Sequence, residues 1–319
     1  MKRFVFNSFS KSGGDQLLWK LSGHRLRILC YHGICEDRLA VQPWMPHFFV
    51  TATDFQKQLE YLLRSACVLP LHDAIIRLRD GSLPPRSVAI TFDDGYANNF
   101  HLAYPLLQKY RLPATIFLSS AYMVSGEIYP FLKLKLIRLH MKSRLAADAL
   151  PEYKSSPLDL VVERAERWWP EVREALAADQ LQTLRPMTIE EVKAMTSPLI
   201  EFGAHTHTHC ILKNESRERR EEEILTSIQK VAEWTGSPVR LFSYPNGQSG
   251  DFGQIDKNAL RAQGIEAAVS GMGGANSAAS DRFELRRYPV GMFHDDIIFR
   301  AEVSGFRNVL NTTMGRLGL

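Results

Sequence analysis

The sequence predicts an α/β protein whose strands form a parallel sheet or barrel. Up to residue 119, short apolar runs rich in β-branched residues alternate with stretches whose apolar residues recur at helical spacing. Such alternation is typical of parallel strands joined by crossover helices. Apolar residues make up 45% and charged residues 23% of the 319 positions, ordinary proportions for a globular protein. We therefore expect one large α/β domain that carries an insertion.

The first half of the chain supplies the clearest strand and helix signals. Residues 87–92 (SVAITF) form a buried-strand pattern that ends abruptly at Asp93, and Thr53 and Asp54 are residue types that cap a helix. The expected elements, in order, are a strand at 26–31, an irregular stretch up to residue 50, a helix that begins at 53–54, a short strand at 69–71, a helix at 72–79, a strand at 87–92, a helix at about 98–110 and a strand at 113–119.

Residues 125–186 interrupt this alternation. The segment is rich in Lys, Arg, Glu, Leu and Ala, which favours helices, and we interpret it as an insertion that caps the site. Trp168 and Trp169 lie in its middle. Tryptophan rings stack on sugars, but anchoring of the insertion is the favoured interpretation.

Regular alternation returns after the insertion. Thr188 and Glu191 form a capping box, and Gly236 is a typical stop signal for the charged helix before it. The expected elements are a short helix from 188 to 195, a strand at 200–204, a helix at 217–235, a strand at 239–243, a helix at 258–263, a strand at 266–270 and a last strand at 287–290.

Charge and hydropathy restrict the partners and the location. The net charge is +4 and the pI is about 8.8, but the basic residues are scattered, which argues against nucleic-acid binding. Residues 1–23 lack an apolar stretch of signal-peptide length, and no run reaches the roughly 18–20 apolar residues that span a bilayer. We expect a cytoplasmic protein, with peripheral association with the inner membrane face as a further option. The oligomeric state stays open.

Two acidic residues follow a buried strand. Asp93 and Asp94 come directly after residues 87–92, at the strand end where parallel α/β folds assemble their active sites. Adjacent carboxylates can divide the work, one binding a cation and the other accepting protons. The alternative is an Asp-Gly turn in which one aspartate caps the next helix, and the Asp-Asp-Gly motif alone favours that alternative.

Three histidines alternate after another strand, at 205–209 (HTHTH). The spacing of His205 and His209 lets both imidazoles reach one ion if the loop takes a helical turn, whereas His207 would point away. Two histidines and one carboxylate, here Asp94, make a divalent-metal site with open positions, which is typical of catalysis.

The motifs resemble those of a known family. Residues 91–96 (TFDDGY) resemble the first motif of the polysaccharide deacetylases, carbohydrate esterase family 4, and HTHTH resembles the second. Further similar segments are LPPRSVAITFDDGYANN, PATIFL, MTIEEV, EEEILTSIQKVAEWTG and FSYPNG, so the similarity covers roughly 26–290 around the insertion. The expected organisation is an N-terminal extension at 1–25, a deacetylase-like domain at 26–300 with its insertion at about 125–186, and a C-terminal tail at 301–319.

The resemblance implies a fold and a set of roles. The fold would be an irregular (β/α)₇ barrel, similar to a TIM barrel, with the site at its C-terminal mouth. Asp93 would be the catalytic base, and Asp94, His205 and His209 would hold a divalent metal, for which Zn²⁺ is the first expectation. Tyr96, Tyr244 and Pro245 of the motif loops are expected at the substrate. They are identified by their motif positions.

The chain also departs from the family pattern. Many members carry an arginine before the proline of the third motif, where this chain has Ser243. Arg287 in LRRYPV resembles an arginine of a subgroup and is the candidate replacement, with a surface ion pair as the alternative. His32 in CYHG is the candidate for substrate binding or proton transfer. The late Leu-x-His motif that supplies the general acid is not clearly present, and His294 is its only late counterpart.

The expected reaction is hydrolysis of an N-acetyl group from an acetylated amino sugar in a glycan or a glycan precursor. The expected location favours a lipid-linked or other cytoplasmic biosynthetic intermediate as the carbohydrate substrate over finished extracellular polymer. A deformylase, an O-acetyl esterase or another C–N amidohydrolase would use the same metal chemistry. A non-catalytic glycan-binding protein on the same barrel is the third alternative, which the missing arginine supports and the paired aspartates oppose.

Overall fold

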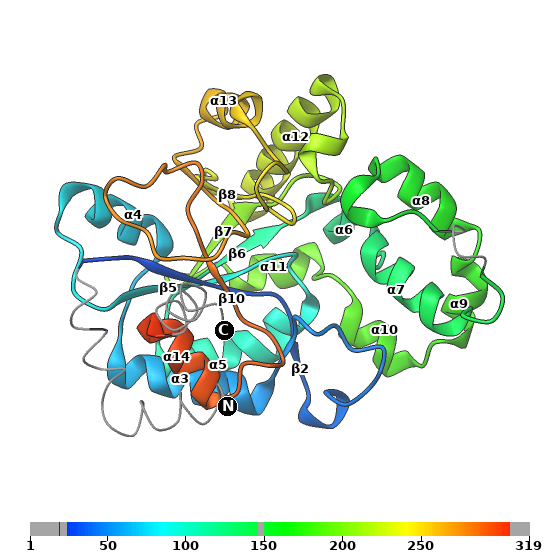
Figure 1. The fold of residues 1–319 in the computed structure, drawn as a ribbon, viewed down its shortest axis with the longest axis horizontal. Helices are drawn as coiled ribbons and strands as arrows, with labels where there is room; N and C mark the ends of the chain where they lie inside the picture. Colours follow the sequence, from blue (N-terminus) through cyan, green and yellow to red (C-terminus); the bar gives the residue numbers. More distant parts are fainter. Residues whose placement is uncertain (1–18, 20–23, 146–149, 307–319) are drawn as a thin grey trace, which may run out of the picture.

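Eight of the described strands form one curved parallel sheet, shown in Figure 1, and the other two pair with each other. The computed structural model describes residues 19, 24–145 and 150–306. Neighbouring strands follow the order β10-β1-β5-β6-β7-β8-β9, and β4 pairs with β5 outside this path. The strands are β1 (Arg27–Tyr31), β2 (Ile34–Cys35), β3 (Val50–Thr51), β4 (Cys67–Val68), β5 (Ser87–Phe92), β6 (Ala114–Leu118), β7 (Ile200–Ala204), β8 (Leu241–Ser243), β9 (Ala267–Val269) and β10 (Tyr288–Pro289). This sheet confirms the predicted irregular (β/α)₇ barrel.

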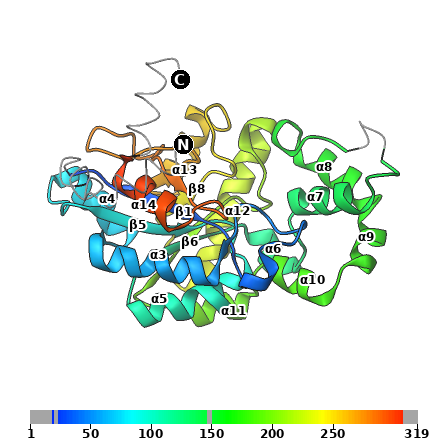
Figure 2. The ribbon, with the colours of Figure 1, turned by 60° about the horizontal axis from the view of Figure 1, so that its bottom comes forward.

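Helices surround the sheet. In Figure 2, α3, α5 and α11 lie on one side of it, and α12 and α13 lie on another. The helices are α3 (Ala52–Ser65), α4 (Leu71–Asp80), α5 (Tyr104–Tyr110), α6 (Ser120–Ser125), α7 (Pro130–His140), α8 (Leu158–Glu166), α9 (Trp169–Ala175), α10 (Ala178–Leu184), α11 (Ile189–Met195), α12 (Arg217–Thr235), α13 (Gln254–Ala262) and α14 (Asp296–Ser304). Among the described residues, no helix is both long and apolar enough to cross a membrane.

The barrel centre is apolar because its strands are covered on both faces. Every residue of β1, β5 and β6 is buried, as parallel strands under crossover helices usually are. Glycine at position 203 of β7 is required by packing, since a Cβ there would lie 2.5 Å from the ring of Phe117 and 2.8 Å from the Leu241 carbonyl oxygen. The buried strands hold the polar loops that follow them in fixed positions.

A short extended segment joins the two ends of the sheet. Leu285 forms a parallel bridge with Val269 of β9, and Tyr288 of β10 pairs with Leu29 of β1. The backbone N–H of Ser270, just after β9, also donates to the Leu285 carbonyl oxygen at 2.8 Å. Arg287 lies between these two pairings, on the segment that closes the barrel.

The insertion is helical, as predicted, and forms a lobe at the right of Figure 1. Its helices are α7, α8, α9 and α10, and α7 packs against both α8 and α9. Trp169 is buried and its ring lies 5.1 Å from the Lys133 ammonium of α7, while Trp168 packs against the same core. Neither tryptophan lines the main cavity, so both stabilise the insertion itself.

Two element boundaries in the first half were wrong. Helix α3 begins at Ala52 because the Thr51 side chain accepts a hydrogen bond from the Asp54 N–H at 3.0 Å, so Thr51 is the cap. The strand expected at 69–71 is at Cys67–Val68 instead, because Pro70 precedes the first turn of α4.

Irregular structure around the first motif was not predicted. Strands β2 and β3, of two residues each, pair within the stretch expected to be irregular. The helix after the Asp-Asp-Gly motif opens with a π-helical turn at Asn99–Ala103. There, the Asn99 side chain donates to the His32 carbonyl oxygen at 2.7 Å, and the Asn98 side chain accepts from the Ile34 N–H at 2.8 Å. These contacts fasten the helix to the loop after β1.

Two later helices also differ from the expectation. Helix α13 begins at Gln254, where the Asp256 carboxylate accepts from the Gly253 N–H at 2.7 Å. Helix α14 spans residue 300, the expected domain limit, and packs on α3. Most of the predicted N-terminal extension and residues 307–319 of the predicted tail lie outside the described residues, and the domain limits stay predictions.

Candidate active site

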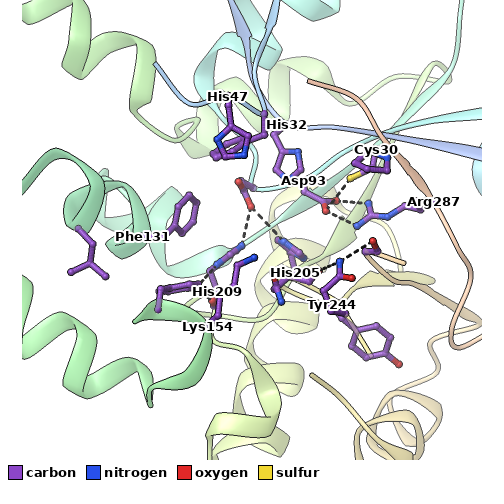
Figure 3. A pocket seen from close by; sticks show the side chains of 18 of the residues that line it. Cys30, His32, His47, Asp93, Phe131, Lys154, His205, His209, Tyr244 and Arg287 are labelled. Atoms are coloured by element: carbon purple, nitrogen blue, oxygen red, sulfur yellow. Dashed lines mark hydrogen bonds and ion pairs between the residues drawn. The ribbon is translucent and has the colours of Figure 1, made fainter. Parts of the chain in front are cut away.

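The two motif loops meet in one cavity of about 430 Å³ at the C-terminal ends of the strands. Asp93 and Asp94 follow β5, His205 and His209 follow β7, and His32 follows β1. Figure 3 shows Asp93, His205, His209 and His32 around the cavity. Because the strands are parallel, segments far apart in the sequence deliver their side chains to the same edge.

Three buried side chains converge on one point. The Asp94 Oδ1 atom lies 3.0 Å from His209 Nε2 and 3.4 Å from His205 Nε2. On the far side of its ring, His205 Nδ1 donates to the Ser243 carbonyl oxygen at 2.7 Å. In neutral His205 the Nε2 atom therefore presents a lone pair to the carboxylate. Two acceptors facing each other in a buried site require a positive charge between them.

This donor set fits a divalent cation. Asp94 Oδ1 is buried and accepts no hydrogen bond from the described residues, and the three ligand atoms lie within 4.8 Å of one another. Burial opposes the charge of Asp94, but the cationic form of the two facing histidines, His209 and His205, outweighs it and holds its pKa well below the usual range. Two imidazoles and one carboxylate with open positions are typical of catalytic zinc and related sites.

The loop backbones that make this convergence possible are unusual. Asp94, Thr206 and His209 have φ angles of 69°, 59° and 58°, the left-handed region that residues other than glycine rarely adopt. The histidines converge without the helical turn that their spacing suggested as one route, because no helix forms at 205–209. The two left-handed residues turn the histidines toward Asp94 instead, and such strain is common at functional sites.

Asp93 is held by Arg287. Its Oδ1 and Oδ2 atoms accept hydrogen bonds from the guanidinium at 2.7 and 2.6 Å, and both side chains are buried. Ser243, at the position of the family arginine, donates to Asp93 at 3.3 Å and accepts from Arg287 at 3.0 Å. Burial alone would raise the pKa of Asp93, but Arg287 lowers it to about 2. Arg287 thus occupies the place expected for the motif-three arginine, and Arg286 is exposed.

His32 lies on the Asp93 side of the cavity. Its Nδ1 atom is buried and has no hydrogen-bond partner among the described residues, and burial lowers its pKa. One ring nitrogen of His32 lies within 4.8 Å of an Asp93 carboxylate oxygen. His294 does not line the cavity, and its Nδ1 atom accepts from the Gly291 N–H at 3.1 Å.

Of the three residues expected at the substrate, one lines the cavity and two do not. Tyr244 lines the cavity, but its ring stacks on Phe252 at 3.8 Å and its hydroxyl donates to the Phe283 carbonyl oxygen. The Tyr96 ring is fully buried, and Pro245 is also buried; neither lines the cavity. Tyr96 and Pro245 therefore support the motif loops from behind.

The sequence patterns did not identify the residues that form one wall of the cavity. The insertion contributes aromatic, apolar and charged side chains, and the loop before β3 adds two aromatic rings. These residues are His47, Phe48, Phe131, Leu134, Arg138, Glu152, Tyr153 and Lys154. None of them follows a strand or belongs to a recurring pattern, so only their three-dimensional placement identifies them.

Known proteins share both the motifs and the fold. The model of the family described as polysaccharide deacetylase matches residues 80–268. Poly-beta-1,6-N-acetyl-D-glucosamine N-deacetylase of Staphylococcus epidermidis is 31% identical over 115 residues, which are 36% of this chain and 39% of that protein. The protein of the same name in Staphylococcus aureus strain N315 is 33% identical over 78 residues, 24% of this chain and 27% of that protein. The matches thus span about a third of these relatives.

Two solved structures have the same fold. The Streptococcus pyogenes deacetylase PplD, in complex with acetate, superposes with a TM-score of 0.62 at 17% identity, over 88% of this chain and 98% of that chain. IcaB from Ammonifex degensii superposes with a TM-score of 0.57 at 19% identity, over 88% and 98% of the two chains. The family match covers more than half of this chain and contains both motif loops, and the chain belongs to the polysaccharide deacetylases, carbohydrate esterase family 4.

Proposed function

We propose that the chain is a metal-dependent hydrolase that removes N-acetyl groups from an acetylated amino sugar in a glycan or glycan precursor. One observation carries the proposal. The unpartnered Asp94 Oδ1 faces the Nε2 atoms of two histidines, in the same cavity as a second carboxylate that Arg287 holds ionised. A binding protein has no need of this pair of differently held carboxylates.

The side chains divide the chemistry of amide hydrolysis. A divalent cation bound by Asp94, His205 and His209, with zinc as the first candidate, would polarise the amide carbonyl and lower the pKa of water. Asp93 is ionised and oriented to accept the proton of the attacking water, although its low pKa makes it a weak base. His32, whose buried Nδ1 atom has no hydrogen-bond partner among the described residues, lies on the Asp93 side of the cavity and is the candidate to hydrogen-bond the leaving amine.

The cavity walls suit a sugar. Phe48, Phe131 and Leu134 form an apolar side, while Asn246 and Gln248 offer amide groups on the barrel side. Sugar rings have one apolar face and polar hydroxyls at the edge, so both kinds of wall can be used. The name of the Staphylococcus epidermidis relative makes β-1,6-linked N-acetylglucosamine oligomers the first substrates to test. A lipid-linked substrate and a cytoplasmic location stay predictions.

The test is product analysis with the purified full chain. We expect acetate and free amine in equal amounts from N-acetylglucosamine oligomers, loss of both after chelation, and recovery with Zn²⁺ or another divalent ion. On a panel of further substrates, acetate without amine from an O-acetylated sugar would instead indicate an O-acetyl esterase, formate from an N-formylated sugar a deformylase, and ammonia from a primary amide another amidohydrolase. Glycan binding without any of these products would support the non-catalytic alternative.

A further inference from the structure

Tyr153 belongs to the insertion and yet contacts a ligand of the metal site. Its hydroxyl lies 2.6 Å from His209 Nδ1 and also donates a hydrogen bond to the His209 carbonyl oxygen. The two rings stack with an angle of 27° and centroids 6.0 Å apart. The insertion therefore reaches the far side of the imidazole that faces Asp94.

These contacts determine the tautomer of His209. A carbonyl oxygen only accepts, so the Tyr153 proton points to it and the phenol oxygen presents a lone pair to His209 Nδ1. The Nδ1 atom must then carry the ring proton, which leaves a lone pair on Nε2, toward the metal position. Outer partners of this kind orient metal-binding histidines and raise their basicity.

The position of Tyr153 is itself fixed. Asn214, which follows the histidine motif, donates from its side chain to the carbonyl oxygens of Lys154 and Ser156, each at 3.2 Å. The Phe131 ring of α7 meets the Tyr153 ring edge-on at 5.5 Å. The tyrosine is thus held from the barrel side and from the insertion, as a positioning group must be.

We propose that Tyr153 is a positioning residue of the metal site, which makes the insertion a part of the metal centre as well as a wall of the cavity. The proposal rests on the proposed function, because it requires that Asp94, His205 and His209 bind a cation. For His205 the corresponding partner is a backbone carbonyl of the barrel, so the insertion acts on one ligand only.

The test is metal affinity, measured by competition with a chromophoric chelator for Zn²⁺. Tyr153→Phe removes the hydroxyl and keeps the ring packing, and we expect the dissociation constant to rise by about 10–100-fold. Tyr110→Phe is the matched control, because it removes a hydroxyl that donates to Glu60 at 2.7 Å, outside the cavity lining. The control should bind Zn²⁺ within about twofold of the wild type, below the change expected for an outer partner. At saturating Zn²⁺, Tyr153→Phe should regain most of its acetate release.

An unchanged dissociation constant for Tyr153→Phe would overturn the proposal, and so would an activity loss that saturating Zn²⁺ does not reduce. If the melting temperature of the metal-free variant falls, Asn214→Ala provides the second test, since it releases the segment without changing the ring and should also weaken Zn²⁺ binding. Weakened binding in a protein that releases no acetate from any substrate would contradict the proposed function and leave the role of Tyr153 standing.

Discussion

The charge of Asp93 depends on a single buried guanidinium. Both carboxylate oxygens are hydrogen-bonded to Arg287, and both side chains are buried. A buried ion pair of this kind contributes little net stability as a pair, yet removing one partner leaves an uncompensated charge. Arg287 therefore affects both the stability of the protein and the geometry of its proposed base.

Arg287→Met should lower the free energy of unfolding by about 3–5 kcal/mol at neutral pH, because Asp93 stays buried without its partner. Urea unfolding followed by circular dichroism measures this. Adding Asp93→Asn should restore a large part of the loss, since the buried charge is then gone. Arg286→Met, a change at the exposed neighbour, should stay within about 0.5 kcal/mol of the wild type. Equal effects of the two arginine variants would contradict the buried pair.

The same pair predicts a dependence of stability on pH. The pKa of Asp93 is lowered to about 2 in the folded protein, below the roughly 3.9 of an unfolded aspartate. Its stabilising contribution should be complete above about pH 4 and disappear as the pH falls through about 2. Measuring the free energy of unfolding of the wild type and of Asp93→Asn as the pH is lowered isolates the contribution of Asp93. If both proteins lost stability equally between pH 4 and 2, this contribution would be absent.

Asp93→Asn should reduce acetate release by about 10²–10⁴-fold, the usual contribution of a general base. Its metal content, measured by elemental analysis after dialysis, should not change. The double variant His205→Ala/His209→Ala should instead lose the metal itself. If Asp93→Asn hydrolysed substrate at the wild-type rate, Asp93 would not be the base.

Among individual site residues, the sequence predicted those that follow strands. Asp94, His205 and His209 are brought together as expected, because the ends of parallel strands share an edge. For Arg287 the sequence left two interpretations open, a partner of Asp93 or a surface ion pair, since no local pattern distinguishes a buried guanidinium from a surface one. Tyr153 could not be identified, because its contact with His209 depends on how the insertion folds back over the barrel.

The first helix shows how a single cap decides where an element begins. The sequence offered Thr53 as a cap for α3, but Thr51 accepts from the Asp54 N–H. Thr53 instead donates to Asp37 at 3.0 Å on the exposed surface. Both residues have suitable side chains, and only the path of the preceding chain selects between them.

Thr51→Ala should therefore destabilise the protein by about 1 kcal/mol, through loss of the cap. Thr53→Ala should cost less than about 0.5 kcal/mol, because its hydrogen bond is exposed. Thermal unfolding of the two variants makes the comparison. The reverse order of stabilities would restore Thr53 as the cap.

Elements with continuous apolar runs were the easiest to predict. Strands β1, β5 and β6 lie within a residue of their expected bounds, because a strand buried on both faces has a distinct composition. The two-residue strands β2 and β3 are too short to carry any periodicity. The π-helical turn at Asn99–Ala103 depends on side-chain contacts with distant loops, which no local pattern encodes.

For the whole molecule, metal binding should be coupled to folding. A cation that binds only the folded chain, and not the unfolded one, stabilises it by about 2.7 kcal/mol when the free cation concentration is a hundred times the dissociation constant. We expect Zn²⁺ to raise the melting temperature of the wild type and a chelator to lower it again. His205→Ala/His209→Ala should show no such shift, and an equal shift in that variant would place the bound ion elsewhere.

The alternation of strands and helices predicted a parallel sheet or a barrel, since few other arrangements accommodate it, and the family resemblance specified the irregular barrel. The insertion was predicted as helical and as a cap, and it does line the cavity. The sequence could not predict which side chains of the insertion face the cavity, because their direction depends on the angle at which α7 packs.

The extended segment at 285–289 has a consequence for the order of events during synthesis. Asp93 and Arg287 are separated by 194 positions, so the loop after β5 leaves the ribosome well before the arginine does. Until then, β1 and β9 lack the segment that joins them, and Asp93 has no guanidinium partner. A nascent chain can thus contain both motif loops and still lack the guanidinium that holds Asp93, so that the proposed site is assembled only after residues 285–289 have been added.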